Sequence, residues 1–193
     1  MTNSFVLVDN SGSMARFRYP IGTYDPVKFL AEAFLTAASP SNLVGLISFA
    51  SRVKVERYCS PDPTDLLSAL AHVAPPGGVT ELVDAMFVSL AVDIGQINNL
   101  FIISDKGENA SEFSMATLQA AIKANNPTLA IYWIIPPLPR VFRPIPKFLN
   151  TPPGVKVLKE LGAKVLDFSK FTDDAKFVEV IDKIHDGRIR ELL

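Results

Sequence analysis

The sequence predicts an α/β fold with three layers: a doubly wound, mostly parallel central sheet, one antiparallel edge strand and helices on both faces. Short runs rich in Val, Ile and Leu alternate with longer stretches whose apolar residues recur at helical spacing. Most of these short runs are apolar throughout, which is typical of parallel strands buried on both faces. One run alternates apolar and charged residues, as an edge strand of an antiparallel pair does.

The expected elements follow one another along the whole chain. In chain order they are a strand over 5–8, a helix over 26–38, strands over 43–49 and 53–58, helices over 63–71 and 80–93, a strand over 100–103, a helix over 114–123, a strand over 129–135, a helix over 155–161, a strand over 165–168 and a last helix capped by 172–174. Asp25 and Pro26 form an N-cap followed by proline at the first helical position. The run over 53–58 is the expected antiparallel edge.

Composition limits the function classes. The 193 residues fit one domain spanning 1–193, and 48% hydrophobic with 20% charged residues argues against disorder. A net charge of −1 leaves no field to hold nucleic acid or a membrane surface, and no apolar run is long enough to span a membrane. The one cysteine, Cys59, excludes an internal disulfide framework. Without a signal-like N-terminus, we expect a cytoplasmic location.

Polar residues occur in three of the predicted connections between a strand and a helix or between two helices. Ligands of doubly wound sheets bind beyond the carboxyl ends of the strands, so these residues are the candidates for chemistry. Residues 9–13 offer one carboxylate and two hydroxyls at alternate positions. All the offered atoms are oxygens, which suit Mg²⁺, Mn²⁺ or Ca²⁺ better than zinc. The candidate metal ligands are Asp9, Ser11, Ser13, Thr80 and Asp105.

This set resembles the metal-ion-dependent adhesion site (MIDAS) of von Willebrand factor A domains. The family pattern is Asp-x-Ser-x-Ser on the first strand, a distant Thr and an Asp after the central strand. It corresponds here to residues 9–13, the Gly-Gly-Val-Thr run at 77–80, and Ile-Ser-Asp at 103–105. Residues 43–49 are also similar to the second strand of the family, so the resemblance covers almost the whole chain. In one departure, Lys106 stands where the family usually has glycine.

The resemblance implies a protein-binding module and no enzyme. Serine and threonine hydroxyls would bind Mg²⁺ directly or through water, with Mn²⁺ or Ca²⁺ as alternatives, and the two aspartates would lie close. A carboxylate of a partner protein would complete the coordination. Intracellular members of the family often belong to multi-subunit assemblies, and the same setting is implied here.

Two other functions stay open. Phosphotransferases or phosphatases of the haloacid-dehalogenase type also use Mg²⁺ and an Asp at the end of the first strand. They need a general acid two residues later, where this chain has Ser11, a poor proton donor at neutral pH. The second alternative is a scaffold domain whose metal site is not functional, which the cation of Lys106 would favour.

Two basic, aromatic segments are expected beside the site, over 15–24 and 136–153. Their cations are Arg16, Arg18, Arg140, Arg143 and Lys147. These segments would form two basic lips that attract an acidic partner. Alternatively, their aromatic residues pack the segments against the core and the charges are simply solvated. Trp133 and Cys59 are expected to be packed residues without chemistry.

Overall fold

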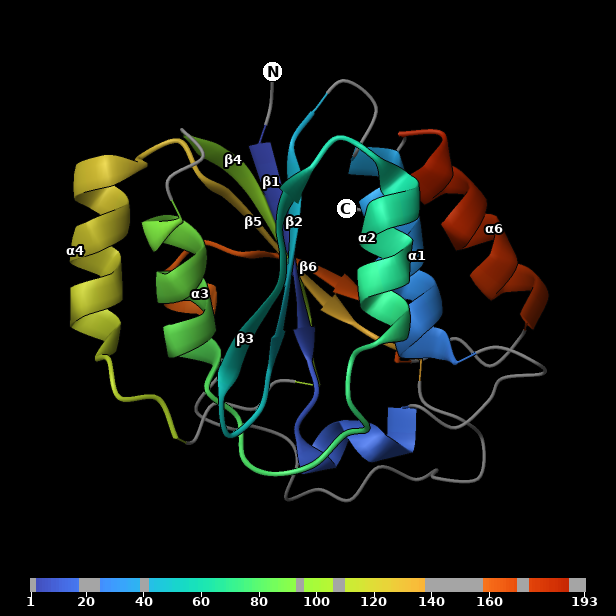
Figure 1. The fold of residues 1–193 in the computed structure, drawn as a ribbon, viewed down its shortest axis with the longest axis horizontal. Coiled ribbons are helices and arrows are strands. Elements are labelled where there is room, and N and C mark those ends of the chain that lie inside the picture. The colour runs from blue at the N-terminus through green and yellow to red at the C-terminus, as the bar shows by residue number, and fades with distance from the viewer. Residues whose placement is uncertain are drawn as a thin grey trace.

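The computed structural model describes residues 3–17, 25–38, 42–92, 96–105, 110–137, 158–169 and 174–187. Its elements, drawn in Figure 1, are β1 (Asn3–Asp9), η1 (Gly12–Phe17), α1 (Pro26–Ala38), β2 (Val44–Phe49), β3 (Val53–Ser60), α2 (Pro63–Ala71), α3 (Leu82–Ala91), β4 (Ile97–Ile103), α4 (Met115–Asn125), β5 (Ala130–Ile135), β6 (Lys164–Asp167) and α6 (Asp174–His185).

These strands form one sheet in the order β3-β2-β1-β4-β5-β6. All neighbouring pairs are parallel except β2 with β3, which is antiparallel and places β3 at the edge. The predicted fold class is therefore confirmed. After β1 the chain adds β2 on one side and later β4 on the other, so the carboxyl ends of β1 and β4 flank the topological switch point.

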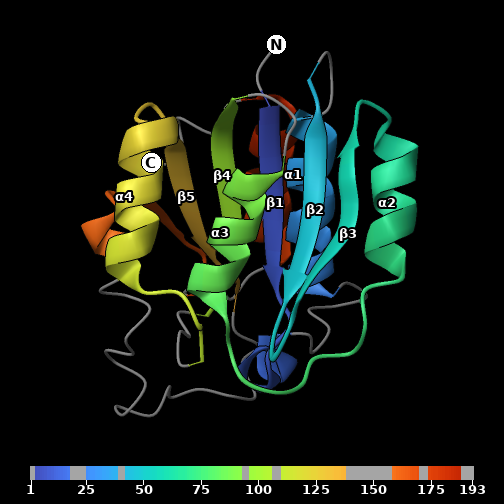
Figure 2. The same ribbon diagram turned by 60° about the vertical axis from the view of Figure 1, so that its left-hand side comes forward.

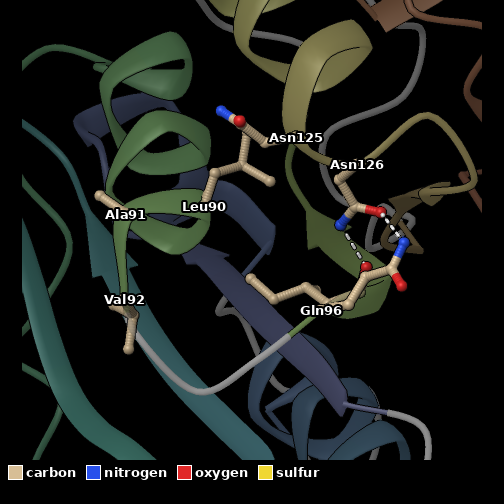
Figure 3. A pocket seen from close by; sticks show the side chains of 7 residues that line it. Leu90, Ala91, Val92, Gln96, Asn125 and Asn126 are labelled. Atoms are coloured by element: carbon tan, nitrogen blue, oxygen red, sulfur yellow. Dashed lines mark hydrogen bonds between the residues drawn. The ribbon is translucent and has the colours of Figure 1, made fainter.

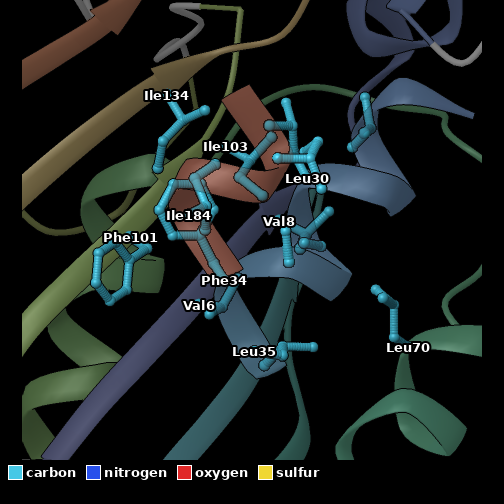
Figure 4. Packing of buried hydrophobic residues seen from close by; sticks show 14 of the residues in the cluster. Val6, Val8, Leu30, Phe34, Leu35, Leu70, Phe101, Ile103, Ile134 and Ile184 are labelled. Carbon is cyan, nitrogen blue, oxygen red and sulfur yellow. The ribbon is translucent and has the colours of Figure 1, made fainter. Parts of the chain in front are cut away.

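Helices cover both faces of the sheet. Figures 1 and 2 show α3 and α4 on one face, and α1, α2 and α6 on the other. Under α1 and α6, a buried cluster brings Phe34 and Ile184 against Val8 and Ile103 of the central strands (Figure 4). The rings of Phe34 and Phe101 stack with centroids 4.9 Å apart.

On the opposite face of the sheet, close packing requires a glycine in β2. Phe5 and Leu7 of β1 point into a second buried cluster beneath α3 and α4. A Cβ atom at Gly45 of β2 would lie 2.0 Å from Cε1 of Phe5. The phenyl ring therefore requires a glycine at this position in the neighbouring strand.

Two differences from the expected elements concern the site. The helix expected over 80–93 begins only at Leu82, because Glu81 has a non-helical backbone with φ −110° and ψ 61°. Thr80 consequently lies in the connection before α3. The short helix η1, directly after the Asp-x-Ser segment, was not expected from the sequence. Of the helix expected over 155–161, residues 158–160 are helical, whereas 155–157 lie outside the described residues.

Among the residues that the structure describes, no helix is both long enough and apolar enough to cross a membrane.

Candidate metal centre

The five expected ligands are distributed over three neighbouring connections at the carboxyl edge of the sheet. Asp9 ends β1, and Asp105 follows β4, the strand paired in parallel with β1. Asp9, Ser11, Thr80 and Asp105 are at most 3% exposed, whereas Ser13 is exposed. Burial of such polar groups costs free energy unless they are paired.

Hydrogen bonds link four of these residues into one chain. The backbone N–H of Ser11 donates to Oδ1 of Asp9 at 2.8 Å, and the hydroxyl oxygens of Ser11 and Ser13 lie 3.1 Å apart. The Ser13 hydroxyl donates to Oδ1 of Asp105 at 3.0 Å. The structure thus brings together residues that are 96 positions apart in the sequence at their extremes.

The turn that carries Thr80 is attached to the same segment. Gly12 donates its N–H to the carbonyl of Gly78 at 3.0 Å, and Gly77 donates to the carbonyl of Asn10 at 2.8 Å. These two backbone bonds place the start of the 77–80 run against the Asp-x-Ser loop. Thr80 follows two residues later and is 2% exposed.

Gly78 is required by this turn for two reasons. Its φ is +78°, in the left-handed region that side chains disfavour, and an added Cβ atom would lie 2.1 Å from Oγ of Ser51. The Ser51 hydroxyl oxygen in turn accepts the N–H of Val79 at 3.1 Å. The loop after β2 therefore supports the turn from its other side.

Asp9 is a buried carboxylate held by two donors. Its Oδ2 accepts the Ser104 hydroxyl at 2.6 Å, and the carbonyl of Ser104 accepts Nε1 of Trp133 at 3.1 Å. Burial raises the pKa of Asp9 from 3.8 to about 6; the bonds from Ser104 and Ser11 lower it, and the charge of Asp105 raises it slightly. Trp133 is a core residue, as predicted. Ser104 was missed, although its position directly before Asp105 at a strand end was a usable signal.

Arg16 forms an ion pair with Asp105 that the sequence did not predict. Its Nη2 atom lies 2.6 Å from Oδ2 of Asp105. Ser13 and Arg16 are three residues apart in η1, and residues at this spacing in a 3₁₀ helix lie on the same side. Both therefore reach the same carboxylate, one at each oxygen.

Two described residues of the first lip, Phe17 and Arg16, support different interpretations of it. Phe17, an aromatic residue of the segment over 15–24, is 4% exposed and packs in the core, so for this residue the packing interpretation is correct. The Arg16 side chain is not simply solvated, because it pairs with Asp105 in the site. The other charged lip residues and Lys106 lie outside the described residues.

A reciprocal pair of caps connects α3 to the segment that precedes α4. Glu81 at the N-cap of α3 makes no side-chain cap; instead the Ser111 hydroxyl accepts two first-turn N–H groups at 3.0 and 3.2 Å. The buried carboxylate of Asp84 accepts the N–H groups of Glu112 and Phe113, both at 2.9 Å. The connections that carry Thr80 and Asp105 are therefore joined beyond the site itself.

A family model for the von Willebrand factor type A domain matches residues 5–108, more than half of the chain. The chain belongs to this family. VWA domains are protein-interaction modules and are generally not enzymes. A search of curated protein sequences found no match.

Several solved structures share the VWA fold. BatB from Bacteroides thetaiotaomicron matches with a TM-score of 0.64 and 12% identity, over 96% of this chain and 98% of that chain. The SpRpn10 VWA domain matches with a TM-score of 0.59 and 16% identity, over 89% and 90%. Manganese-loaded TRAP protein from Plasmodium vivax matches with a TM-score of 0.57 and 14% identity, over 88% and 70%. At these identities the likeness shows the fold alone.

The donor chemistry of this VWA domain fits a hard divalent cation. Asp9, Ser11, Ser13 and Asp105 present carboxylate and hydroxyl oxygens within one hydrogen-bonded chain, and Mg²⁺ is bound through such oxygens and water. No cluster of three or more acidic, His or Cys side chains that could hold a metal occurs among the described residues. Besides the two carboxylates, a cation here would thus depend on hydroxyls and on a ligand from outside.

Two hollows differ in their relation to this site. One of about 450 Å³ lies between α3 and α4 near the start of β4, at the edge opposite the candidate ligands (Figure 3). Its polar side chains bond within the protein, with Nε2 of Gln96 donating to Oδ1 of Asn126 at 3.3 Å. The other, of about 350 Å³, adjoins the Asp-x-Ser loop and is lined in part by Asn10, Gly77 and Arg52.

Proposed function

We propose that this chain is a single VWA domain that docks a partner protein through a divalent cation, Mg²⁺ in the first place, with Mn²⁺ or Ca²⁺ as alternatives. A carboxylate of the partner would complete the coordination. The observation that carries this proposal is the hydrogen-bonded chain from Asp9 to Asp105 at the switch point of the sheet. The residues that would hold the ion are Asp9, Ser11, Ser13, Thr80 and Asp105.

The environment of Asp9 supports a cation at this place. Its carboxylate is 0% exposed, and desolvation is the main reason for its raised pKa. A buried negative charge favours a positive partner, because the Coulomb attraction is less screened there than at the surface. When bound, the ion would supply a Lewis-acid position for an external carboxylate. The uncharged hydroxyls of Ser11 and Ser13 would leave part of its charge unneutralised.

The hollow beside the Asp-x-Ser loop supports an acidic partner segment. Lys54 on its wall pairs with Glu56 at 2.5 Å, and the Ser48 hydroxyl also donates to Glu56 at 2.6 Å. Arg52, on the same wall, is exposed. Residues next to the bound carboxylate could therefore find a complementary positive charge.

We also propose that the domain works in an intracellular, cytoplasmic multi-subunit assembly. Cys59 is half-buried, and burial raises its pKa to about 11, so the thiol stays protonated and poorly reactive at neutral pH. A fold that depends on no disulfide is compatible with a reducing compartment.

The direct test is thermal unfolding of the purified protein with increasing Mg²⁺. A ligand that binds only the folded state raises the free energy of unfolding by RT ln(1 + [L]/Kd). We expect the melting temperature to rise with Mg²⁺ in the wild type and in the control Asp182→Ala, which removes an exposed carboxylate on α6. Asp9→Ala should abolish the rise.

Equal responses of the wild type and Asp9→Ala would show that the metal binds elsewhere. A pull-down from lysate in Mg²⁺ and in EDTA then tests partner binding. The proposal requires a partner retained in Mg²⁺ and lost in EDTA.

A further inference from the structure

Both oxygens of the Asp105 carboxylate are already engaged inside the protein. Oδ1 accepts the Ser13 hydroxyl at 3.0 Å, and Oδ2 lies 2.6 Å from Nη2 of Arg16. Asp105 is 3% exposed, while the Arg16 side chain is 22% exposed. This is a largely desolvated ion pair, and its cation comes from the site's own loop.

Besides this ion pair, the Arg16 side chain has one ring contact and one unpaired donor. Its guanidinium lies over the Phe17 ring, 4.9 Å from the centroid. Its Nε atom is buried and has no hydrogen-bond partner among the described residues. An unpaired buried donor costs free energy, so the contacts with Asp105 and Phe17 must offset this cost.

We propose that Arg16 is a resident counter-ion of Asp105, which competes with the divalent cation for this carboxylate and so lowers the metal affinity of the site. The inference rests on the proposed function. Two cations at one carboxylate repel each other, so binding of the metal and pairing of Arg16 oppose each other. In the metal-free protein, Arg16 neutralises a carboxylate that would otherwise be buried without a counter-charge.

The proposal predicts opposite effects of one substitution in the two states. Arg16→Gln keeps the length of the side chain but removes its charge. Without metal, this variant should melt at a lower temperature than the wild type, because buried Asp105 loses its counter-ion. In Mn²⁺ titrations followed by electron paramagnetic resonance, it should bind Mn²⁺ more tightly than the wild type by at least about fivefold, the lower end of typical coupling between two ligands.

Two further variants separate competition from general effects. Lys176→Gln removes an exposed cation of α6, outside the candidate site and the hollow beside it, and should leave Mn²⁺ affinity close to that of the wild type. Arg16→Lys keeps the charge and should bind Mn²⁺ more weakly than Arg16→Gln. A purely structural role of Arg16 would make its loss weaken Mn²⁺ binding, which is the opposite result.

The outcomes distinguish this inference from the proposed function. Equal Mn²⁺ affinity of the wild type and Arg16→Gln, with no binding by Asp9→Ala, would overturn the competition and leave the proposed function intact. Binding by Arg16→Gln alone would confirm the competition and contradict metal-dependent docking by the wild type, as in a scaffold domain. If neither protein binds Mn²⁺ at millimolar concentration, both proposals are wrong.

Discussion

The two carboxylates of the candidate site have different electrostatic surroundings. Asp105 pairs with Arg16, whereas Asp9 is held by the Ser11 N–H and the Ser104 hydroxyl, which are neutral donors. Neutral donors compensate only part of the desolvation, and the pKa of Asp9 therefore remains raised, at about 6. The ionised form of Asp9 thus destabilises the metal-free fold.

This difference predicts a pH dependence of the metal-free protein. The unfolded chain releases the Asp9 proton near pH 3.8 but the folded protein only near pH 6, so the folded state binds more protons between these values. The contribution of Asp9 to the free energy of unfolding should therefore fall as pH rises through this window, by on the order of 2–3 kcal/mol in total.

The isosteric variant Asp9→Asn isolates that contribution. In EDTA, we expect it to be as stable as the wild type at about pH 4 and more stable at about pH 7. Urea denaturation of both proteins at several pH values measures the difference. A difference that does not change with pH would contradict the assigned titration of Asp9.

Among the elements, α3 and the segment before α4 depend on each other for their backbone hydrogen bonds. The first turn of α3 is capped by Ser111 and not by a residue of its own, and Asp84 of α3 returns two bonds to that segment. Because Thr80 precedes α3 and Asp105 precedes Ser111, we expect this interlock of four hydrogen bonds also to position the two connections that carry these candidate ligands.

Removing the interlock should therefore affect both stability and metal affinity. Ser111→Ala should lower the free energy of unfolding by about 1 kcal/mol, the usual cost of losing a cap. Asp84→Ala should cost about 1–3 kcal/mol, because the N–H groups of Glu112 and Phe113 both lose a charged acceptor. The double variant should cost less than the sum, since both residues belong to one network. Both single variants should also weaken Mn²⁺ binding.

The N-cap of α4 offers a matched control. The Ser114 hydroxyl accepts the N–H of Thr117 at 3.1 Å within α4 and connects no two loops. Ser114→Ala should cost about 1 kcal/mol as well, yet leave Mn²⁺ affinity unchanged. If Ser111→Ala and Ser114→Ala affect Mn²⁺ binding equally, the interlock does not position the site.

At the scale of the whole molecule, the net charge is only −1, so there is little overall electrostatic attraction for a partner. The charges close to the site therefore determine how electrostatics affects the association rate. Arg140 and Arg143 lie in the basic segment over 136–153, mostly outside the described residues, and their placement at the site remains a prediction. Charges at the rim of an interface act mainly on the association rate and are screened over about 8 Å at physiological ionic strength.

Reversing both arginines to glutamate should thus slow association with an acidic partner at low salt and matter less at high salt. Asp9→Ala should instead speed dissociation, because it removes a central and desolvated contact. Surface-plasmon kinetics on the partner captured in Mg²⁺ measure both rates. Equal association rates of the wild type and the double reversal at low salt would favour the interpretation that this segment only packs against the domain.

The fold class and the candidate ligands were predictable because they depend on short-range patterns. Apolar runs such as 5–8 and 100–103 require burial on both faces of the sheet. The alternation of apolar and charged residues over 53–58 is instead typical of a strand at the edge of the sheet. Strand ends follow from these runs, and Asp9 and Asp105 stand at two of them. The match of the family pattern then depended on residue types at set spacings.

Only the tertiary structure decided which charges meet at the site. The sequence drew attention to Lys106 as a cation beside Asp105, yet among the described residues the ion pair comes from Arg16, 89 positions away. Likewise, no local pattern shows that Ser111 caps α3, and the position of Ser104 at a strand end does not by itself show that its hydroxyl binds Asp9. Secondary structure follows from the spacing of apolar residues within a short segment of the chain. The partner of a charged or capping side chain depends instead on which loops the order of the strands brings together.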